Sequence, residues 1–262
     1  LADLSFERYP EFFSPAARFW HTLVNPRWLC RRADAIVVNS AHTKRELLDV
    51  YGVPAERVTV AYLGCDPCMF RRVPDEARRL VADRLGLPSR YILAVGNLEP
   101  RKNLGSLIAA HDRLRPEADL VIVGRAVYQA ERLYRQAART RYPERIHFLG
   151  YVAAADRPAL YQSAACLAYP SYYEGFGLPV LEAMASGTPV VASSATAVPE
   201  VVGSAGVLVD PYDVRALADA IGAVLQDADL RQRLITAAAL RAKRFTWDET
   251  ARVTSSVLER LV

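Results

Sequence analysis

The 262-residue chain is 52% hydrophobic and 24% charged, a balance that suits one large or two small globular domains. It has no apolar run near the roughly 18–20 residues of a membrane span and no signal peptide, and its first residue is Leu rather than Met, which indicates a longer gene product. The net charge of +4 is mildly basic, but no RNA- or DNA-binding motif accompanies the arginine pairs, so no nucleic-acid partner is expected.

The first 64 residues predict part of an α/β unit. Runs of β-branched residues alternate with helical patterns, which is typical of a parallel sheet, and Ser40 is expected to cap the second helix. Two strands are too few for an independent core, so we interpret residues 1–64 as the remnant of a larger domain. The expected elements are helices over 15–33 (interrupted near 26) and 40–51, and strands over 35–39 and 58–62.

Residues 65–88 contain three prolines, a charged helical pattern over 75–85 and no strand, so we interpret them as an interdomain linker. Cys65 and Cys68 form a C-x-x-C pair, but no histidine lies close by in sequence at zinc-ligand spacing. No metal site is therefore expected. Four cysteines are too few for a disulfide framework in a chain this long, which favours a reducing compartment.

From Tyr91 onward, strand and helix patterns alternate regularly. Residues 89–246 therefore predict a complete doubly wound, Rossmann-like domain. A last helix over 247–262 is expected to pack back toward the N-terminal domain. The expected strands are 91–95, 120–123, 146–149, 166–169, 189–192 and 206–209. The first expected helix follows the turn 96–103 and ends near 114, and the others span 131–139, 157–163, 178–186, 213–226 and 229–244.

Ligands of doubly wound sheets bind outside the carboxyl ends of the strands. The loop after the predicted strand 166–169 contains Gly175 and Gly177, and Pro179 suits the first turn of the helix that follows. Glycine lets backbone approach a ligand, and free amides at a helix start attract anions. Many tight turns also need glycine, so this loop alone does not decide between a ligand site and a structural turn.

The loop after the predicted strand 91–95 carries Arg101 and Lys102 at the start of the next helix, where the helix dipole disfavours cations. An anion shared with the glycine loop explains this choice, because Arg can bind phosphate oxygens with two donors. Exposed surface cations are the alternative interpretation of this pair taken alone.

Glu174 and Glu182 flank the glycine loop. Eight residues of helix separate two groups by about 12 Å, beyond the roughly 5–9.5 Å between glycosidase carboxylates, which argues against a glycosidase. Carboxylates beside a phosphate site suit sugar hydroxyls, so the three features together indicate a nucleoside diphosphate sugar, with solvated surface carboxylates as the alternative. In the absence of a metal motif, the two cations are expected to neutralise the diphosphate, and no cofactor is expected.

The run from Glu174 to Ala192 resembles the E-x7-E region of the retaining glycosyltransferases of family four, which have the GT-B fold. Residues 96–104, 148–152 and 208–212 match further segments of that family. The resemblance covers nearly the whole chain, is most specific from Tyr91 onward, and is greatest to bacterial mannosyltransferase-like enzymes of cell-surface polysaccharide assembly.

The resemblance implies transfer of a sugar, expected to be mannose, from a GDP- or UDP-sugar to a hydroxyl of a glycan or lipid-linked acceptor, with retention at the anomeric carbon. It also implies a cytoplasmic location with peripheral contact to the inner membrane. The implied fold is of GT-B type, with one complete Rossmann-like C-terminal domain and the tail of an acceptor-side N-terminal domain.

In the roles that the resemblance implies, Glu174 binds donor-sugar hydroxyls, Arg101 and Lys102 bind the diphosphate, and Glu182 binds the ribose. Because Glu174 and Arg101 lie in loops, where packing demands are small, alanine at either position is expected to weaken donor binding without unfolding the domain. The other implied donor-binding residues act through main-chain groups or leave room for the donor, and are Gly96, Asn97, Gly150, Tyr151, Val152, Gly175, Phe176, Gly177 and Leu178. For Tyr151 and Val152, the alternative interpretation is that they simply end a strand.

One position departs from the family: related sequences commonly have a His before the Asp-Leu-Ser-Phe segment, whereas this chain has Ala2. Two hypotheses therefore remain, a glycosyltransferase fragment that lacks most of its acceptor domain, and a non-catalytic sugar-nucleotide-binding scaffold. A Rossmann oxidoreductase is disfavoured, because no Gly-x-Gly-x-x-Gly follows the first strand of the larger domain. The fragment hypothesis predicts exposed apolar surface around Phe12, Phe13, Phe19 and Trp20.

Overall fold

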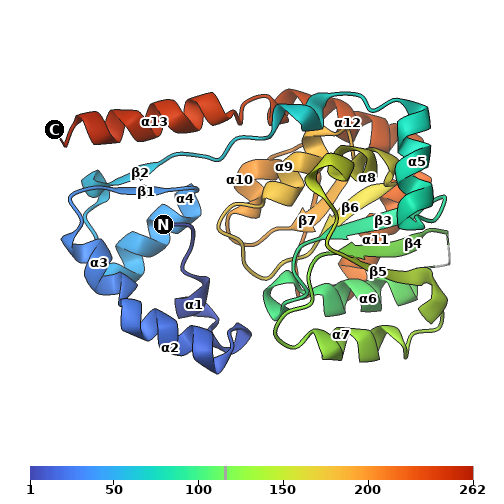
Figure 1. The fold of residues 1–262 in the computed structure, drawn as a ribbon, viewed down its shortest axis with the longest axis horizontal. Helices are drawn as coiled ribbons and strands as arrows, with labels where there is room; N and C mark the ends of the chain where they lie inside the picture. Colours follow the sequence, from blue (N-terminus) through green and yellow to red (C-terminus); the bar gives the residue numbers. More distant parts are fainter. Residues whose placement is uncertain (115–116, 262) are drawn as a thin grey trace.

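The computed structural model describes residues 1–114 and 117–261 and contains two parallel sheets (Figure 1). We call residues 1–64, built around the two-stranded sheet, the small unit, and residues 65–246, built around the six-stranded sheet, the large lobe. Their buried apolar side chains form separate clusters, one around the small sheet and one on each face of the large sheet.

The strands of the large sheet lie in the order β5-β4-β3-β6-β7-β8, and every neighbouring pair is parallel. If the strands of this sheet are renumbered with β3 as the first, their order is 3-2-1-4-5-6, the order of dinucleotide-binding sheets. The direction in which successive strands are added reverses between β3 and β6. The loops that follow β3 and β6 therefore meet at the point where such sheets bind ligands. The strands are β3 (Tyr91–Val95), β4 (Asp119–Val123), β5 (Ile146–Gly150), β6 (Cys166–Tyr169), β7 (Val190–Ser193) and β8 (Val207–Val209).

Helices cover both faces of the large sheet because its strands are apolar on both sides. Leu93 packs into one core cluster, whereas its neighbours Ile92 and Ala94 pack into the other, as strand alternation requires. One face is covered by α8 (Arg157–Ser163), α9 (Leu178–Ala185), α10 (Val198–Val202) and α12 (Ala228–Ala242), and the other by α6 (Leu104–Arg113), α7 (Ala130–Ala137) and α11 (Val214–Gln226).

In the small unit, β1 (Ile36–Val38) pairs with β2 (Val58–Val60) in parallel. The Ser40 hydroxyl accepts a hydrogen bond from the Thr43 amide and caps α4 as expected. The same helix continues from Leu47 to Tyr51 as a π-helix. The other helices of this unit are α1 (Ser5–Arg8), α2 (Pro15–Val24), α3 (Pro26–Arg32) and α4 (Ala41–Glu46), with short 3-10 turns η1 (Pro10–Phe12) and η3 (Ala55–Arg57).

The segment after the small unit packs on the large lobe. Cys65 and Met69 are buried in its core, and α5 (Asp75–Leu85) packs against α8. The last helix, α13 (Trp247–Glu259), runs back along β1 and β2 (Figure 1), and Thr250 Oγ1 donates to the Tyr62 carbonyl at 2.6 Å. The remaining 3-10 turns are η4 (Pro67–Phe70), η5 (Pro100–Lys102), η6 (Pro143–Arg145) and η7 (Ala154–Asp156).

The sequence patterns predict all eight of these strands to within two residues. They miss the four-residue helix α1 and the five-residue helix α10, which are too short to show helical periodicity. The expected helix 247–262 ends at Glu259, and its last position lies outside the described residues. Of the helices in the described part of the chain, none combines the length and apolar character that a bilayer crossing requires.

The expected apolar surface is present in part. Phe19 and Trp20 of α2 are 71% and 60% exposed. The prediction is wrong for Phe12 and Phe13, which are half-buried, because Phe12 stacks on Tyr172 of the large lobe and Phe13 packs edge-on against a histidine of α2.

Candidate functional site

Hydrogen bonds fasten the loop after β3 to the loop after β6. The Tyr172 amide donates to the Arg101 carbonyl at 2.9 Å. The buried Asn103 Nδ2 donates to the carbonyl oxygens of Pro170 and Pro211, at 3.0 and 2.7 Å, and thus joins the loops that follow β3, β6 and β8. The cationic loop and the glycine loop therefore lie at the same edge of the sheet.

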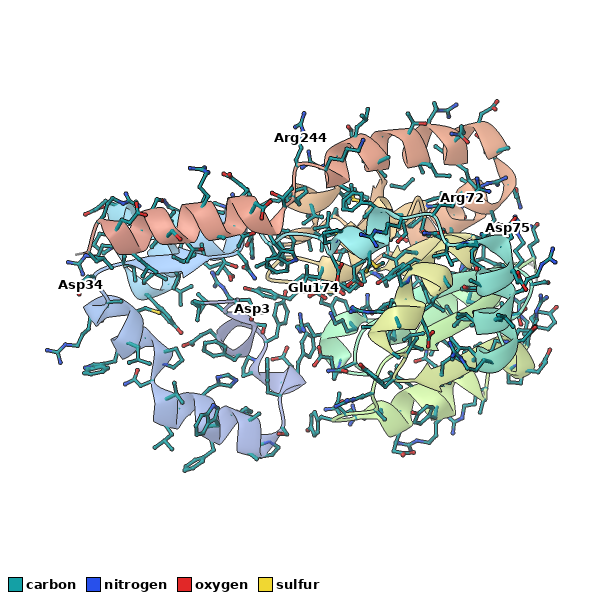
Figure 2. All side chains as sticks on the ribbon, turned by 45° about the horizontal axis from the view of Figure 1, so that its top comes forward. Asp3, Asp34, Arg72, Asp75, Glu174 and Arg244 are labelled. Carbon is teal, nitrogen blue, oxygen red and sulfur yellow. The ribbon has the colours of Figure 1, made fainter. Side chains whose placement is uncertain are left out.

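A buried ionic cluster forms where these loops meet. Glu174 accepts from Arg101 Nη1 at 2.8 Å and from Lys102 Nζ at 2.7 Å, one cation on each carboxylate oxygen. Lys102 Nζ also contacts the Tyr169 hydroxyl at 2.8 Å, and Arg101 Nη2 donates to Glu99 at 2.7 Å. Glu174 is only 5% exposed and lies where the large lobe faces the small unit, across from Asp3 (Figure 2).

The two cations decide the charge of Glu174. Burial raises the pKa of its carboxyl, but Lys102 and Arg101 outweigh burial and hold that pKa at about 2. Burial and the Glu174 charge together raise the pKa of the Tyr169 phenol well above its usual range. At neutral pH the cluster therefore combines an ionised carboxylate, two cations and a neutral phenol.

The glycine turn beside this cluster presents backbone donors. Gly177 adopts a left-handed conformation with φ 107° and ψ 49° and begins α9 without a side-chain cap. The amides of residues 175–178 have no acceptor in the part of the chain that the structure describes. The preceding amide, that of Glu174, donates to the Thr196 hydroxyl at 3.0 Å. Four neighbouring free amides at a helix start suit an anion or a hydroxyl oxygen.

Glu182 lies within α9, after the glycine turn, and has a different set of partners. Arg157 Nη1 and the Tyr161 hydroxyl donate to its two oxygens, each at 2.8 Å. Burial raises the pKa of the Glu182 carboxyl, and these two partners lower it by less. The side chain of Arg157 is 37% exposed, so solvent screens this pair more than the cations of Glu174.

A cavity of about 400 Å³ opens beside the cluster, at the carboxyl ends of β3, β4 and β5. Gly124 is needed for its shape, because a Cβ atom there would lie 1.9 Å from the Gly96 carbonyl oxygen. Arg157, the partner of Glu182, also lines this cavity, which therefore extends from the loop after β3 to the side chain that binds Glu182. The cavity is lined by Val95, Gly96, Asn97, Val123, Gly124, Arg125, Tyr151, Val152 and Arg157.

The small unit closes the site from the opposite side. A Cβ on Gly175 would lie 2.4 Å from the Ala2 carbonyl oxygen, so Ala2 and the glycine turn are in direct contact. The Tyr173 hydroxyl donates to Glu46 of α4, and it accepts from the Leu4 amide at 3.2 Å. Burial, followed by the contact with Glu46, raises the pKa of the Tyr173 phenol.

A second contact between the lobes involves Glu200 of α10. Its carboxylate accepts from the Ala41 and His42 amides at 2.8 and 2.7 Å, and it thus occupies the N-terminus of α4. The Tyr62 hydroxyl donates to the same carboxylate at 3.1 Å. The large lobe thus supplies an acidic cap to a helix of the small unit.

The residues expected to act at the site converge, although their functional roles stay predictions. Glu174, Arg101 and Lys102 are in direct contact, Gly175, Phe176, Gly177 and Leu178 adjoin them, and Gly96, Asn97, Tyr151 and Val152 line the cavity. Gly150 does not line it; its carbonyl accepts from the Gly124 amide at 2.8 Å. The premise of small packing demands is wrong for Glu174, which is buried between two cations.

Several functional partners were missed from the sequence. Tyr169 looked like an ordinary strand residue, and Tyr161 like an ordinary helix residue. Arg157 carried a usable signal, because it stands in the first turn of a helix, where the dipole disfavours cations, as it does for Arg101 and Lys102.

Two family profiles match the chain. The profile of the Glycosyl transferases group 1 family matches residues 82–241, more than half of the chain. The profile of Glycosyltransferase Family 4 matches residues 5–67.

The chain is also similar to curated proteins. The O-antigen chain mannosyltransferase B of Escherichia coli is 35% identical over 220 residues, which are 82% of this chain and 58% of that protein. The D-inositol 3-phosphate glycosyltransferase of Salinispora tropica is 37% identical over 238 residues, which are 84% of this chain and 49% of that protein. The chain thus spans about half the length of the curated relatives it matches.

Solved structures match the fold over nearly the whole chain. The HepE protein of Anabaena, solved in complex with UDP-glucose, has a TM-score of 0.81 and 26% identity over 95% of this chain and 70% of that one. The sucrose-phosphate synthase of Thermosynechococcus elongatus has a TM-score of 0.82 and 26% identity over 99% of this chain and 66% of that one. The expected fold class, α/β of the GT-B type, is confirmed.

Proposed function

The chain belongs to the glycosyl transferases group 1 family, and from this premise we propose that it forms the donor-binding part of a retaining glycosyltransferase. In this proposal the donor is a nucleoside diphosphate sugar and the transferred sugar is mannose. Support for mannose comes from the 35% identity to an O-antigen chain mannosyltransferase, and support for the donor class comes from a similar structure solved with UDP-glucose.

One observation carries the proposal: the Glu174 cluster and four free amides meet at the switch point of the sheet. Glu174 and Glu99 together balance the charges of Arg101 and Lys102, so the diphosphate binds a cluster that is neutral overall. The amides of residues 175–178 and the α9 dipole then supply much of the attraction for the anion. Each cation also keeps at least one N–H that bonds to no described residue.

The two carboxylates act on different parts of the donor. Each oxygen of Glu174 accepts one bond from a cation and has a further lone pair for a sugar hydroxyl. Glu182 is bound to Arg157, which lines the cavity, and in this proposal the Glu182 oxygens accept from the ribose hydroxyls.

The proposed reaction occurs on one face of the sugar. The acceptor oxygen forms a bond to the anomeric carbon while the bond from that carbon to the diphosphate breaks and leaves its electron pair on the diphosphate. A phosphate oxygen of the leaving group takes the proton of the acceptor hydroxyl. Arg101, Lys102 and the free amides stabilise the charge that grows on the diphosphate, and the contact between the small unit and the glycine turn excludes water from the donor.

The acceptor in this proposal is a glycan or a lipid-linked glycan, and the reaction takes place on the cytoplasmic side of the inner membrane. The name of the Escherichia coli relative, an enzyme of the O-antigen chain, supports this acceptor class.

A second candidate function is sugar-nucleotide binding without transfer. It is favoured by one observation: Ala2 contacts the glycine turn, at the position where the family resemblance leads us to expect His. The methyl side chain of Ala2 cannot donate or accept a proton, so Ala2 cannot act as an acid or a base at this position.

The experiment that tests the proposal incubates the chain with GDP-mannose or UDP-glucose, with and without a mannose-terminated oligosaccharide. We expect release of the nucleoside diphosphate that rises with the oligosaccharide, and a product whose anomeric configuration, read by NMR, equals that of the donor. Binding of the donor without release supports the second candidate. Absence of both binding and release contradicts the proposal.

A further inference from the structure

An arginine stacked on a tyrosine borders the cavity at the ends of β3, β4 and β5. The guanidinium carbon of Arg125 lies 4.9 Å from the centre of the Tyr151 ring. Both side chains line the cavity, and Tyr151 is 66% exposed. This stack therefore does not belong to the hydrophobic core, and it forms one side of the cavity that a ligand can contact.

Arg125 differs from the other cation of the cavity. Arg157 is bound to Glu182 at 2.8 Å. The Arg125 guanidinium has neither a carboxylate nor a hydrogen-bond acceptor within residues 1–114 and 117–261. Its N–H donors are therefore available to a ligand, while the contact with Tyr151 restrains the side chain and reduces the entropy lost on binding.

The ligand groups that fit a restrained guanidinium are two neighbouring acceptors in one plane. Guanine has this pair at O6 and N7, and Arg binds it with two parallel hydrogen bonds. Adenine has an amino group beside N7, which repels the donors of Arg, and uracil has a single acceptor, O4, on the corresponding edge. A base bound there also gains from stacking on an aromatic ring or a guanidinium plane.

We propose that Arg125, held in place by Tyr151, selects guanine as the base of the donor, so that the donor is a GDP-sugar. This inference rests on the proposed function, because it takes the cavity as the base and ribose end of the nucleotide-sugar site. It goes further by assigning the base and the two side chains that choose it.

The first test measures equilibrium binding of GDP, UDP and ADP to the full chain by isothermal titration calorimetry. We expect GDP to bind at least about tenfold more tightly than UDP or ADP, the discrimination of roughly one bidentate base contact. Equal affinities for GDP and UDP, or tighter binding of UDP, overturn the inference.

Variants separate the bidentate contact from simple charge. Arg125→Lys keeps the positive charge but removes the planar pair of donors, so GDP affinity should fall about tenfold while UDP affinity stays the same. Tyr151→Phe should keep the preference for GDP, and Tyr151→Ala should reduce it. Arg233→Lys is the matched control, because Arg233 is an exposed residue of α12 outside the cavity, and it should change neither affinity.

The outcomes distinguish this inference from the proposed function. If GDP and UDP both bind but Arg125→Lys keeps the preference for GDP, Arg125 does not select the base, and the proposed function stands. If neither nucleotide binds to the unmodified chain, the proposed function fails, and the inference fails with it.

Discussion

Of the two carboxylates that flank the glycine turn, Glu174 is buried and Glu182 is half-buried, and their pKa values shift in opposite directions although burial raises both. Glu174 has two cations of low exposure, and its pKa is held at about 2. Glu182 has one cation, 37% exposed, and one phenol, and its pKa is raised by burial. The number and burial of the neighbouring cations, rather than burial of the carboxylate itself, therefore decide the direction in which each pKa shifts.

The largest expected effect is on stability. Glu174→Gln removes the carboxylate between Arg101 and Lys102 and leaves both cations with reduced neutralisation in a buried site. We expect the free energy of unfolding to fall by about 3–5 kcal/mol, the usual result of breaking a buried ion pair on one side. Urea denaturation followed by circular dichroism measures this change.

Glu182→Gln is the matched control for that experiment. The side chain of Arg157 is 37% exposed and regains water when its partner is lost, so the free energy of unfolding should fall by under about 1 kcal/mol. If the free energy of unfolding fell equally in the two variants, the second cation at Glu174 would have no energetic consequence, and the contrast between the two carboxylates would be refuted.

The next effect concerns pH. The pKa of Glu174 is about 2 in the folded chain against 4.5 for an ordinary glutamate, so its stabilising contribution is present above about pH 4.5 and is lost as pH falls toward 2. The total is about 3 kcal/mol. For Glu182 the sign is reversed: its raised pKa gives a contribution that is present below 4.5 and is lost as pH rises through the folded value.

Unfolding free energies of the wild type and of the two glutamine variants, measured from pH 7 down to the lowest pH at which the fold persists, test these signs. The difference between wild type and Glu174→Gln should shrink on acidification below about pH 4.5. The difference between wild type and Glu182→Gln should shift in favour of the wild type. Parallel curves for both variants would show that the two environments do not differ.

The smallest effect is on ligand affinity, and aspartate at each position tests it without removing charge. Glu182→Asp withdraws the oxygens from the ribose position and should weaken binding of a nucleoside diphosphate and of its sugar conjugate alike, by about tenfold. Glu174→Asp should weaken only the sugar conjugate. Calorimetry with GDP and GDP-mannose measures both, and loss of GDP affinity in Glu174→Asp would refute the separate roles.

The fold and the meeting of the two loops follow from the sequence for a physical reason. Strand patterns set the order of elements, and parallel strands place all their carboxyl ends at one edge, so Arg101, Lys102 and Glu174 had to lie near each other. How deeply Glu174 is buried could not be predicted, since the burial of a loop residue depends on what packs over it. Here the small unit packs over the residues that adjoin Glu174, because Ala2 contacts Gly175 and Glu46 accepts a hydrogen bond from the Tyr173 hydroxyl.

Contacts between distant segments could not be predicted from the sequence either. Asn103 joins three loops through a single amide group, and Glu200 caps a helix that begins 159 positions earlier in the chain. Neither has a local motif, because the partner backbone groups come from elements whose arrangement only the folded chain defines.

The central claim is that the loops after β3 and β6 bind one diphosphate between them. Amide chemical shifts of the isotope-labelled chain, recorded as GDP is added, test it most directly. We expect the largest shifts at the free amides of residues 175–178 and at Gly96, with little change across α11 and α12. Shifts confined to other parts of the chain, with these amides unmoved, would contradict the claim.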